Sequence, residues 1–253
     1  MRDLSAPALH AESQGAGRRL VLVHGFTQTG RSWGPLAADL AADHEVVTVD
    51  APGHGGSAAV RATLAQGGGL LGALGPATYV GYSMGGRFCL HTALDHPDRV
   101  ERLVLLGATA GIDDAGERAA RIDGDEALAA GLERDGLGAF LDRWLALPLF
   151  AGLPDDPADR ADRGRNTAAG LASSLRLAGT GTQVPSWDRL AGLAMPVLVR
   201  AGARDAKFAA LGRRLADGIG DNATFAVVPD AGHAAHRERP AEFVRLLRAW
   251  LAP

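Results

Sequence analysis

Short apolar runs recur along the chain, and each is followed by polar or turn-forming residues. Six of them are predicted to be strands: residues 19–23, 45–50, 78–82, 102–106, 197–200 and 224–228. Apolar residues follow one another in these runs with few polar interruptions. This pattern indicates burial on both faces, as in the strands of a parallel sheet.

Helical patterns lie between the predicted strands. Residues 34–42, 209–219 and 240–251 repeat apolar side chains three or four positions apart, and the last segment begins with proline. Because strands and helices alternate, the predicted fold class is α/β with a mostly parallel, doubly wound sheet. The alternation also requires a helix within residues 60–74, but the glycine triplet 67–69 interrupts that segment.

Residues 110–185 break the alternation because they contain no good strand pattern. They hold helical stretches at 126–132 and 137–147, separated and followed by polar turns. The segment is too long for a simple loop. We therefore predict a mostly helical cap at 110–185, inserted into a core made of residues 1–109 and 186–253.

Composition limits the classes of function. The chain has 253 residues, 47% of them hydrophobic and 22% charged, which is ordinary for a soluble globular protein. Its net charge of -3 argues against nucleic acid as a partner. A single cysteine excludes an internal disulfide, and no apolar run suits a signal sequence or a membrane span. We expect a cytoplasmic protein without a membrane partner, and the sequence gives no prediction of oligomeric state.

The segment GYSMG at residues 81–85 carries the strongest chemical signal. It matches the pattern G-x-S-x-G and joins a predicted strand to a predicted helix. A serine at such an elbow presents its hydroxyl outward, and small residues two positions away on either side permit the turn. Ser83 is therefore the candidate nucleophile.

A serine nucleophile requires an imidazole, and the imidazole requires a carboxylate. Asp205 and His233 follow the fifth and sixth predicted strands, in the chain order Ser, Asp, His that this kind of sheet favours. The carboxyl ends of parallel strands meet at one edge, so the three residues are expected to converge. As alternatives, Asp205 only caps the helix near Phe208, His233 is a surface residue, or Asp230 is the acid.

Two backbone amides are expected to form an oxyanion hole. One belongs to Met84, directly after the serine, and the other to Phe26, in the loop after the first predicted strand. His24, His54 and His236 are interpreted as structural residues. The spacing of His233 and His236 would suit a metal, but no third ligand accompanies them, so no metal is expected.

No cofactor is expected either. The sequence has no dinucleotide-binding or P-loop pattern, and the segment 179–181 (GTG) lacks both a third glycine and a preceding strand.

Several longer motifs resemble those of the α/β-hydrolase superfamily over nearly the whole chain. They are HGF (24–26), DAPGHGGS (50–57), GYSMGGR (81–87) and PDAGHAAH (229–236). Other segments are similar to a narrower family, the 2-succinyl-6-hydroxy-2,4-cyclohexadiene-1-carboxylate synthases, which are lyases of menaquinone biosynthesis. These segments are ERAAR (117–121), RLAGTGTQVPSW (176–187), GARDAKF (202–208) and AGHAAHRERP (231–240).

The narrower resemblance implies a small-molecule carboxylate substrate held by arginines. In matching contexts these are Arg87, Arg121 and Arg165, with Arg118 as a competitor for the role of Arg121. Arg87 also lies one helical turn after the serine, on the same face. The resemblance further implies that Tyr82 and Trp144 line the pocket, although Trp144 fits the cap core equally well.

The same resemblance implies the chemistry. His233, supported by Asp205, would make Ser83 basic enough to remove a proton from the substrate, which then loses pyruvate without a metal or organic cofactor. One alternative is a serine hydrolase that attacks a small acyl ester through the same three residues. Another is a ligand-binding protein that has kept the fold without catalysis.

Overall fold

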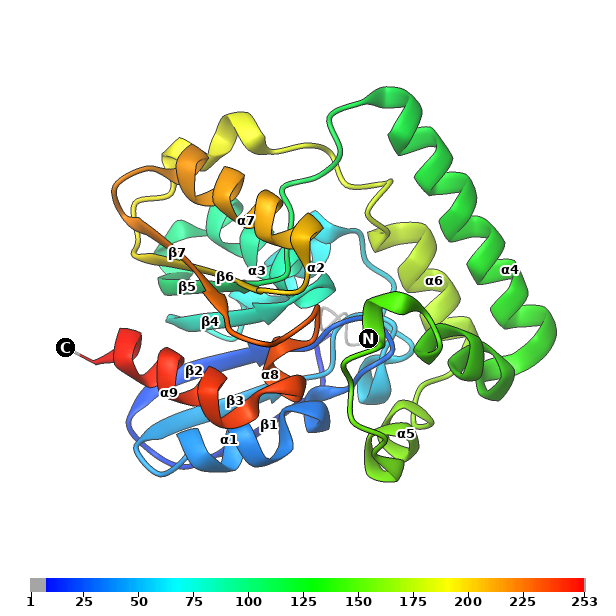
Figure 1. The fold of residues 1–253 in the computed structure, drawn as a ribbon, viewed down its shortest axis with the longest axis horizontal. Helices are drawn as coiled ribbons and strands as arrows, with labels where there is room; N and C mark the ends of the chain where they lie inside the picture. The colour runs from blue at the N-terminus through cyan, green and yellow to red at the C-terminus, as the bar shows by residue number, and fades with distance from the viewer. Residues whose placement is uncertain (1–7, 253) are drawn as a thin grey trace, which may run out of the picture.

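A seven-stranded sheet forms the centre of the computed structural model, which describes residues 8–252. The strand order is β1 (Ala11–Gln14), β3 (His44–Val49), β2 (Arg18–Val23), β4 (Ala77–Tyr82), β5 (Val100–Leu106), β6 (Val197–Gly202) and β7 (Ala223–Val228). All six predicted strands are present and pair in parallel, while β1 pairs antiparallel with β3. This confirms the predicted α/β class (Figure 1).

The antiparallel edge strand β1 was not predicted. Its four residues, AESQ, are all exposed and contain no apolar run. Only backbone pairing with β3, from Ala11 opposite Val49 to Gln14 opposite Val46, makes it a strand. A pattern based on buried side chains has no means of detecting such a segment.

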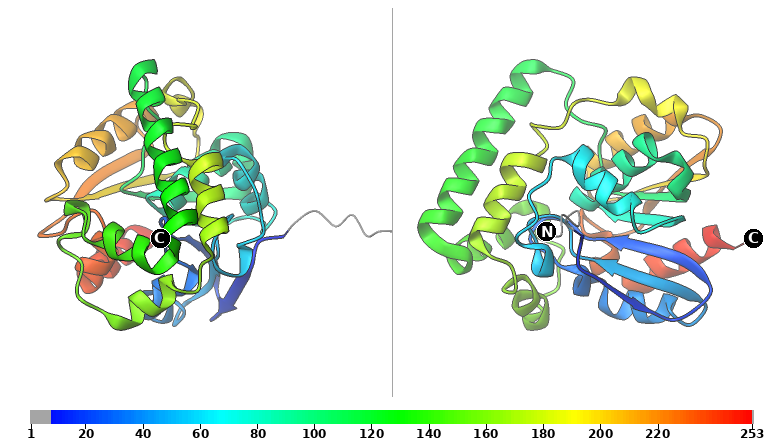
Figure 2. Two further views of the ribbon diagram at one scale, coloured as in Figure 1. Left: turned by 90° about the vertical axis from the view of Figure 1, so that its right-hand side faces the viewer. Right: turned by 180° about the vertical axis from the view of Figure 1, so that it is seen from behind.

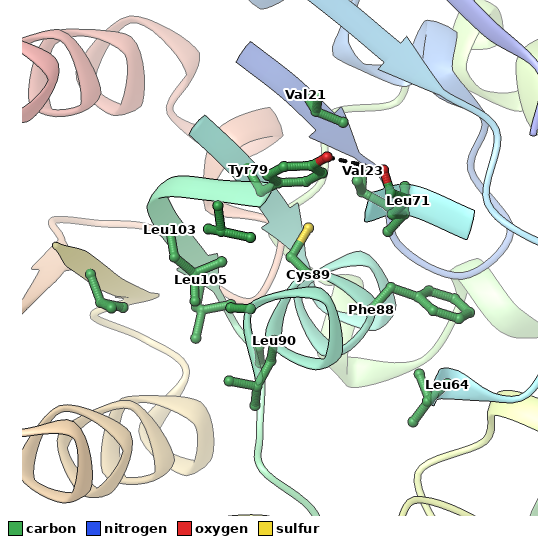
Figure 3. Close-up of a cluster of buried hydrophobic side chains, with 14 of the residues drawn as sticks. Val21, Val23, Leu64, Leu71, Tyr79, Phe88, Cys89, Leu90, Leu103 and Leu105 are labelled. Atoms are coloured by element: carbon green, nitrogen blue, oxygen red, sulfur yellow. Dashed lines mark hydrogen bonds between the residues drawn. The ribbon is translucent and has the colours of Figure 1, made fainter. Parts of the chain in front are cut away.

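Helices cover both faces of the sheet and bury alternate residues of each strand. On one face, α2 (Leu64–Gly72), α3 (Met84–Asp95) and α7 (Ala206–Ile219) pack against side chains such as Val21 and Leu103. Figure 3 shows part of this layer, where the Tyr79 hydroxyl donates a hydrogen bond to the Leu71 carbonyl at 3.0 Å.

The opposite face carries α1 (Gly34–Leu40) and α9 (Pro240–Leu251), which pack against residues such as Leu20 and Val104. A short helix, α8 (Ala235–Glu238), precedes α9. Continuous apolar strands were therefore a correct sign of a sheet buried on both sides.

The glycine-rich segment after β3 does form a helix, α2. Its first turn is closed by a capping box, in which the Gln66 amide donates to Thr63 Oγ1 at 3.3 Å and the Thr63 amide donates to Gln66 Oε1 at 3.0 Å. A Cβ atom at Gly67 would collide with the Phe88 ring. The glycines thus let α2 approach α3 closely, which outweighs their low helix propensity.

Three α-helices lie between β5 and β6, within the predicted insertion. They are α4 (Ala115–Leu145), α5 (Pro157–Arg163) and α6 (Ala168–Ala178). The two predicted helical stretches fall on either side of Gly136, where φ is 81° and α4 is kinked. Helices α4 and α6 run side by side beyond one end of the sheet (Figure 1 and Figure 2). The boundaries 110–185 stay a prediction.

The part of the cap around α5 is bonded to loops of the core. The Thr29 hydroxyl donates to Asp162 Oδ1 at 2.7 Å. Asn166 donates to the Thr27 carbonyl at 2.7 Å and accepts from the Gly55 amide at 2.9 Å. These bonds hold the end of α5 against the loops that follow β2 and β3.

Ion pairs join α4 to the other cap helices. Arg176 of α6 pairs with Glu126 at 2.7 Å and with Glu133 at 2.6 Å. Arg160 of α5 pairs with Asp142 at 2.8 Å. Across residues 8–252, no helix has the length and apolar character that crossing a bilayer requires.

Candidate active site

Ser83 occupies a strained turn between β4 and α3. Its φ of 52° and ψ of -110° are rare for a residue with a side chain. A Cβ atom at Gly81 would lie 2.5 Å from the Gly85 carbonyl oxygen, and one at Gly85 would collide with the Val23 carbonyl oxygen. The two glycines are therefore required by space, and the turn has the geometry expected of a nucleophile elbow.

The structure brings Ser83, His233 and Asp205 together. His233 Nε2 lies 3.1 Å from Ser83 Oγ, and His233 Nδ1 lies 2.7 Å from Asp205 Oδ2. The side chains of His233 and Asp205 are 3% and 8% exposed. Each follows the carboxyl end of its strand, β7 and β6, which explains how distant positions in the sequence converge.

The alternatives for the acid are also resolved by geometry. Asp205 Oδ1 accepts a hydrogen bond from the Phe208 amide at 3.2 Å, so the residue caps α7 while its other oxygen faces His233. Asp230 is 70% exposed and pairs with Arg204 at 3.3 Å. It therefore belongs to the turn and not to the site.

Two residues that the sequence analysis did not assign support His233. The Glu238 carboxylate accepts from the Gly232 amide at 2.7 Å and from the Ala234 amide at 3.1 Å, on either side of the histidine. The Phe208 ring lies 4.4 Å from the His233 ring, centroid to centroid. Glu238 stands in a charged stretch, 236–239, where no sequence signal separates a buried contact from a solvated one.

Phe26 and Met84, whose amides are the expected oxyanion donors, both line the cavity beside Ser83. Met84 is the first residue of α3, where an amide has no carbonyl partner within the helix. The loop before Phe26 approaches closely because Gly25 has no side chain: a Cβ there would lie 2.6 Å from the Tyr82 ring. The role of these amides stays a prediction.

A cavity of about 570 Å³ opens next to Ser83. Apolar side chains from the core and the cap form much of its wall, including Phe26, Leu128 and Trp144. Its lining also contains four cations and one carboxylate: Arg87, Arg121, Arg163, Lys207 and Asp125. The excess of positive charge suits an anionic ligand.

Arg87 lies where the sequence predicted it, on α3 and in the cavity lining. It is 7% exposed and donates to the Ala178 carbonyl at 2.7 Å, which fixes it against the end of α6. Burial, and next the nearby charge of Arg121, lower the pKa of Arg87 to about 10. The guanidinium therefore stays charged at neutral pH.

Arg121, and not Arg118, faces the cavity. Arg121 lines it and donates from Nε to Asp125 Oδ1 at 2.9 Å. Arg118 instead donates to the carbonyl oxygens of Ile112 at 2.9 Å and Asp113 at 2.6 Å, just before α4.

The expectation for Arg165 has to be corrected. Its side chain is 50% exposed, 3.9 Å from Asp162, and it lines a separate small hollow. Arg163 lines the cavity in its place, is 2% exposed and donates to Asp159 at 2.8 Å and to the Thr27 hydroxyl. The sequence carries no signal that separates the two arginines, since Asp159 stands four residues before Arg163 and Asp162 stands three before Arg165, and both spacings allow an ion pair.

Tyr82 and Trp144 both line the cavity. The Trp144 ring also contacts Phe26 at 5.2 Å and Phe150 at 5.6 Å between centroids, so it belongs to the cavity wall and to the cap core at once. Burial raises the pKa of Tyr82, so its phenol stays protonated.

His24, His54 and His236 are buried, and their contacts are structural. His24 Nε2 accepts from the Ala51 amide at 3.0 Å, and His54 Nε2 accepts from the Thr27 amide at 3.3 Å. The His236 ring packs 4.4 Å from the Tyr82 ring. Within residues 8–252 no three His, Cys, Asp or Glu side chains are grouped as metal ligands would be.

Residues 20–246 match the family described as the alpha/beta hydrolase family. The chain belongs to that family. Its sheet, elbow serine and inserted helices are those of an α/β-hydrolase fold.

Within the alpha/beta hydrolase family the chain is similar to one group of enzymes. It is 32% identical to the 2-succinyl-6-hydroxy-2,4-cyclohexadiene-1-carboxylate synthase of Enterobacter sp. (strain 638), over 88% of this chain and 87% of the relative. A Bacillus subtilis (strain 168) protein, provisionally given the same name, is 34% identical over 96% and 94%.

Solved structures give a consistent result for this α/β-hydrolase. The structure of MenH from S. aureus superposes with a TM-score of 0.90, at 28% identity over 96% of this chain and 97% of that one. A thermophilic esterase from Thermogutta terrifontis, with malate bound, superposes with a TM-score of 0.80 at 26% identity, over 96% and 92%.

Proposed function

We propose that this protein is a lyase of menaquinone biosynthesis that removes a proton from a polyanionic intermediate and eliminates pyruvate. The relatives named as 2-succinyl-6-hydroxy-2,4-cyclohexadiene-1-carboxylate synthases support the pathway. The observation that carries the proposal is the joint presence, in one cavity, of the bonded Ser83–His233 pair and three arginines, Arg87, Arg121 and Arg163.

In the proposed reaction Ser83 acts as a base. His233 Nε2 takes the Ser83 proton, and Ser83 Oγ removes a proton from a carbon of the substrate. The electrons of the broken C–H bond form a new C=C bond and expel the three-carbon group by cleavage of its C–O bond. That group, released as an enolate, takes up a proton to become pyruvate, so no covalent bond to Ser83 forms.

The remaining groups hold charge in place. Asp205 fixes the tautomer of His233 and stabilises its protonated form. The amides of Phe26 and Met84 stabilise the negative charge that develops on oxygen. The guanidinium groups hold the carboxylates of the substrate, since each can form two parallel hydrogen bonds to a carboxylate.

A serine hydrolase acting on a small acyl ester is the second candidate. The observation in its favour is the similarity to the Thermogutta terrifontis esterase. The apolar part of the cavity wall would also accept a neutral acyl group. In this reaction Ser83 would attack carbon and form an acyl-enzyme.

One assay separates the two candidates. Purified protein is incubated with the menaquinone-pathway precursor and pyruvate is measured, beside hydrolysis of p-nitrophenyl acetate. We expect rapid pyruvate release, slow ester hydrolysis, and a loss of about tenfold or more in kcat/KM for the precursor in Arg87→Ala. Ester hydrolysis without pyruvate release would exclude the lyase and favour the hydrolase. Turnover of neither compound, despite binding, would favour a ligand-binding protein.

A further inference from the structure

Lys207 stands apart in composition as well as position. The chain has 26 lysine and arginine residues, and Lys207 is the only lysine among them. It lines the cavity beside Ser83, together with Arg87, Arg121 and Arg163. All the remaining basic residues are arginines. Lys207 therefore carries the only primary amine on a side chain of this sequence, and that amine belongs to a residue of the candidate active site.

A contribution to the stability of the fold does not explain why a lysine stands at position 207. Lys207 is the second residue of α7, which begins at Ala206, and a positive charge in the first turn interacts unfavourably with the helix dipole. Within residues 8–252 its ammonium forms no hydrogen bond or ion pair. Arg214, on the same helix but outside the cavity lining, does pair, with Asp113 at 2.6 Å.

The position of Lys207 ties it to the reacting groups. Asp205, two residues earlier, bonds to His233 at 2.7 Å, and the ring of Phe208, the next residue, lies 4.4 Å from the His233 ring. Lys207 therefore enters the cavity from the element that carries the acid. The arginines enter it from other elements, with Arg87 on α3 and Arg121 on α4.

We propose that Lys207 is a specificity-determining residue that binds one carboxylate of the substrate on the His233 side of the cavity. The identity of that substrate rests on the proposed function. The compound 2-succinyl-6-hydroxy-2,4-cyclohexadiene-1-carboxylate carries two carboxylates and pyruvate carries one, so their common precursor is a tricarboxylate. Lys207 is the cation that lies beside the two residues in contact with His233, Asp205 and Phe208.

A lysine suits this place for a physical reason. Arg87 and Arg121 are fixed by bonds to Ala178 and Asp125 before any ligand arrives. Lys207 is exposed, and its ammonium is a compact charge on a flexible four-carbon stem. It can follow a carboxylate that moves during the reaction, which a bonded guanidinium does less well.

Because the amine is unique among the side chains, it can be tested without measuring turnover. Wild-type protein is treated with pyridoxal 5′-phosphate and borohydride, and modification of Lys207 is quantified by peptide mass spectrometry. The dicarboxylate product named above and citrate are the protecting probes, with triethyl citrate as the uncharged control. We expect the product, citrate or both to protect Lys207, and triethyl citrate to give no protection.

Failure of the inference can be told apart from failure of the proposed function. Modification that neither anion reduces would overturn the role of Lys207, whatever the enzyme catalyses. Protection in a protein that releases no pyruvate would retain an anion site at Lys207 and exclude the lyase.

Matched variants supply the second measurement. In Lys207→Met we expect KM for the precursor to rise about tenfold with little change in kcat, while Lys207→Arg stays within about threefold of wild type. Arg214→Gln removes one charge from the same helix outside the cavity and should leave KM unchanged. Since Lys207 opposes the helix dipole, Lys207→Met is expected to melt no lower than wild type. An unchanged KM in folded Lys207→Met would overturn the proposal.

Discussion

Asp205 faces His233 with only one of its two carboxylate oxygens. Oδ2 lies 2.7 Å from His233 Nδ1, while Oδ1 accepts the Phe208 amide at the start of α7. The residue that would orient the imidazole is thus itself held by the helix that begins beside it. Because the two oxygens of Asp205 make different contacts, mutation can separate its contribution to catalysis from its contribution to stability.

Replacing Asp205 with asparagine keeps a good helix cap but removes the charge that faces His233. We expect kcat to fall by about 10³-fold or more in Asp205→Asn, with a small change in stability. Asp205→Ala should lose about 1 kcal/mol more in the free energy of unfolding, because the cap is also lost. Pyruvate-release kinetics and urea unfolding measure both effects. Equal stability of the two variants would show that the cap contributes nothing.

Ser83→Ala tests the nucleophile or base directly. Alanine is small enough for the elbow, so the fold should persist while kcat falls by about 10⁴-fold or more. Thermal melting and circular dichroism check the fold. Ser13→Ala, on the exposed strand β1, is the control and should keep full activity. Wild-type turnover by Ser83→Ala would remove Ser83 from the mechanism.

Arg163 and Arg165 form a natural matched pair. Arg163 lines the cavity, whereas Arg165 lies half-exposed in a separate hollow. We expect Arg163→Lys to raise KM for the precursor about tenfold, because a lysine cannot bond to Asp159, the Thr27 hydroxyl and a carboxylate in one plane. Arg165→Lys should leave KM unchanged. The reverse result would restore the role first expected for Arg165.

Glu238 positions the histidine loop through two backbone amides, and its loss should affect catalysis at a distance. Glu238→Gln keeps one oxygen that can accept from a backbone amide, but its NH₂ group then faces the other of the two amides, Gly232 and Ala234, and both groups are donors. We therefore expect kcat to fall about tenfold with KM little changed. Glu242→Gln, in the exposed Glu242–Arg245 pair of α9, is the control. An altered pH profile of kcat in Glu238→Gln would distinguish a positioning role from simple destabilisation.

The buried histidines predict how stability depends on pH. Burial lowers the pKa of His24 to about 4 and, with the charge of His24, that of His54 to about 3. In the unfolded chain both titrate near 6.5, so the unfolded state binds more protons below that pH. The stability that the two neutral histidines contribute is complete above pH 6.5 and is lost as the pH falls toward their pKa values in the folded state. For His24 this loss in the free energy of unfolding is about 3 kcal/mol.

His54→Gln checks this linkage. Between pH 5 and 6 the free energy of unfolding should fall less steeply in the variant than in wild type as the pH is lowered. The two slopes should differ by about 1.4 kcal/mol per pH unit, which corresponds to about one bound proton. Urea unfolding at several pH values gives the slopes. Parallel slopes would mean that His54 binds its proton equally in both states.

Much of the fold was predictable because its determinants are local. The parallel strands carry long apolar runs, and the G-x-S-x-G turn needs glycines that are visible in the sequence. The strand β1 was not predictable, since its four exposed residues depend on pairing with β3. The glycine-rich segment was hard to predict as the helix α2 for a related reason, because its close contact with Phe88 belongs to tertiary structure.

Some features of the candidate site could likewise be predicted from the sequence, and others depend on tertiary contacts. The elbow and the order of Ser83, Asp205 and His233 follow from the chain itself and from where parallel strands end. The choice between Arg163 and Arg165 depends on how the end of α5 is turned against the Thr27 loop, a contact across more than a hundred residues. Glu238 was missed because its partners are backbone amides, which leave no mark on composition.

The bonds that fasten the cap have a consequence for how this enzyme can change. Asp162 and Asn166 join the end of α5 to the core, while ion pairs join α4 to its neighbours in the cap. Yet α4 supplies Leu128 and Trp144 to the cavity wall. The α4 part of the cavity wall is thus held apart from the serine elbow, so protein engineers can remodel α4 for molecules of another size while the elbow is left untouched.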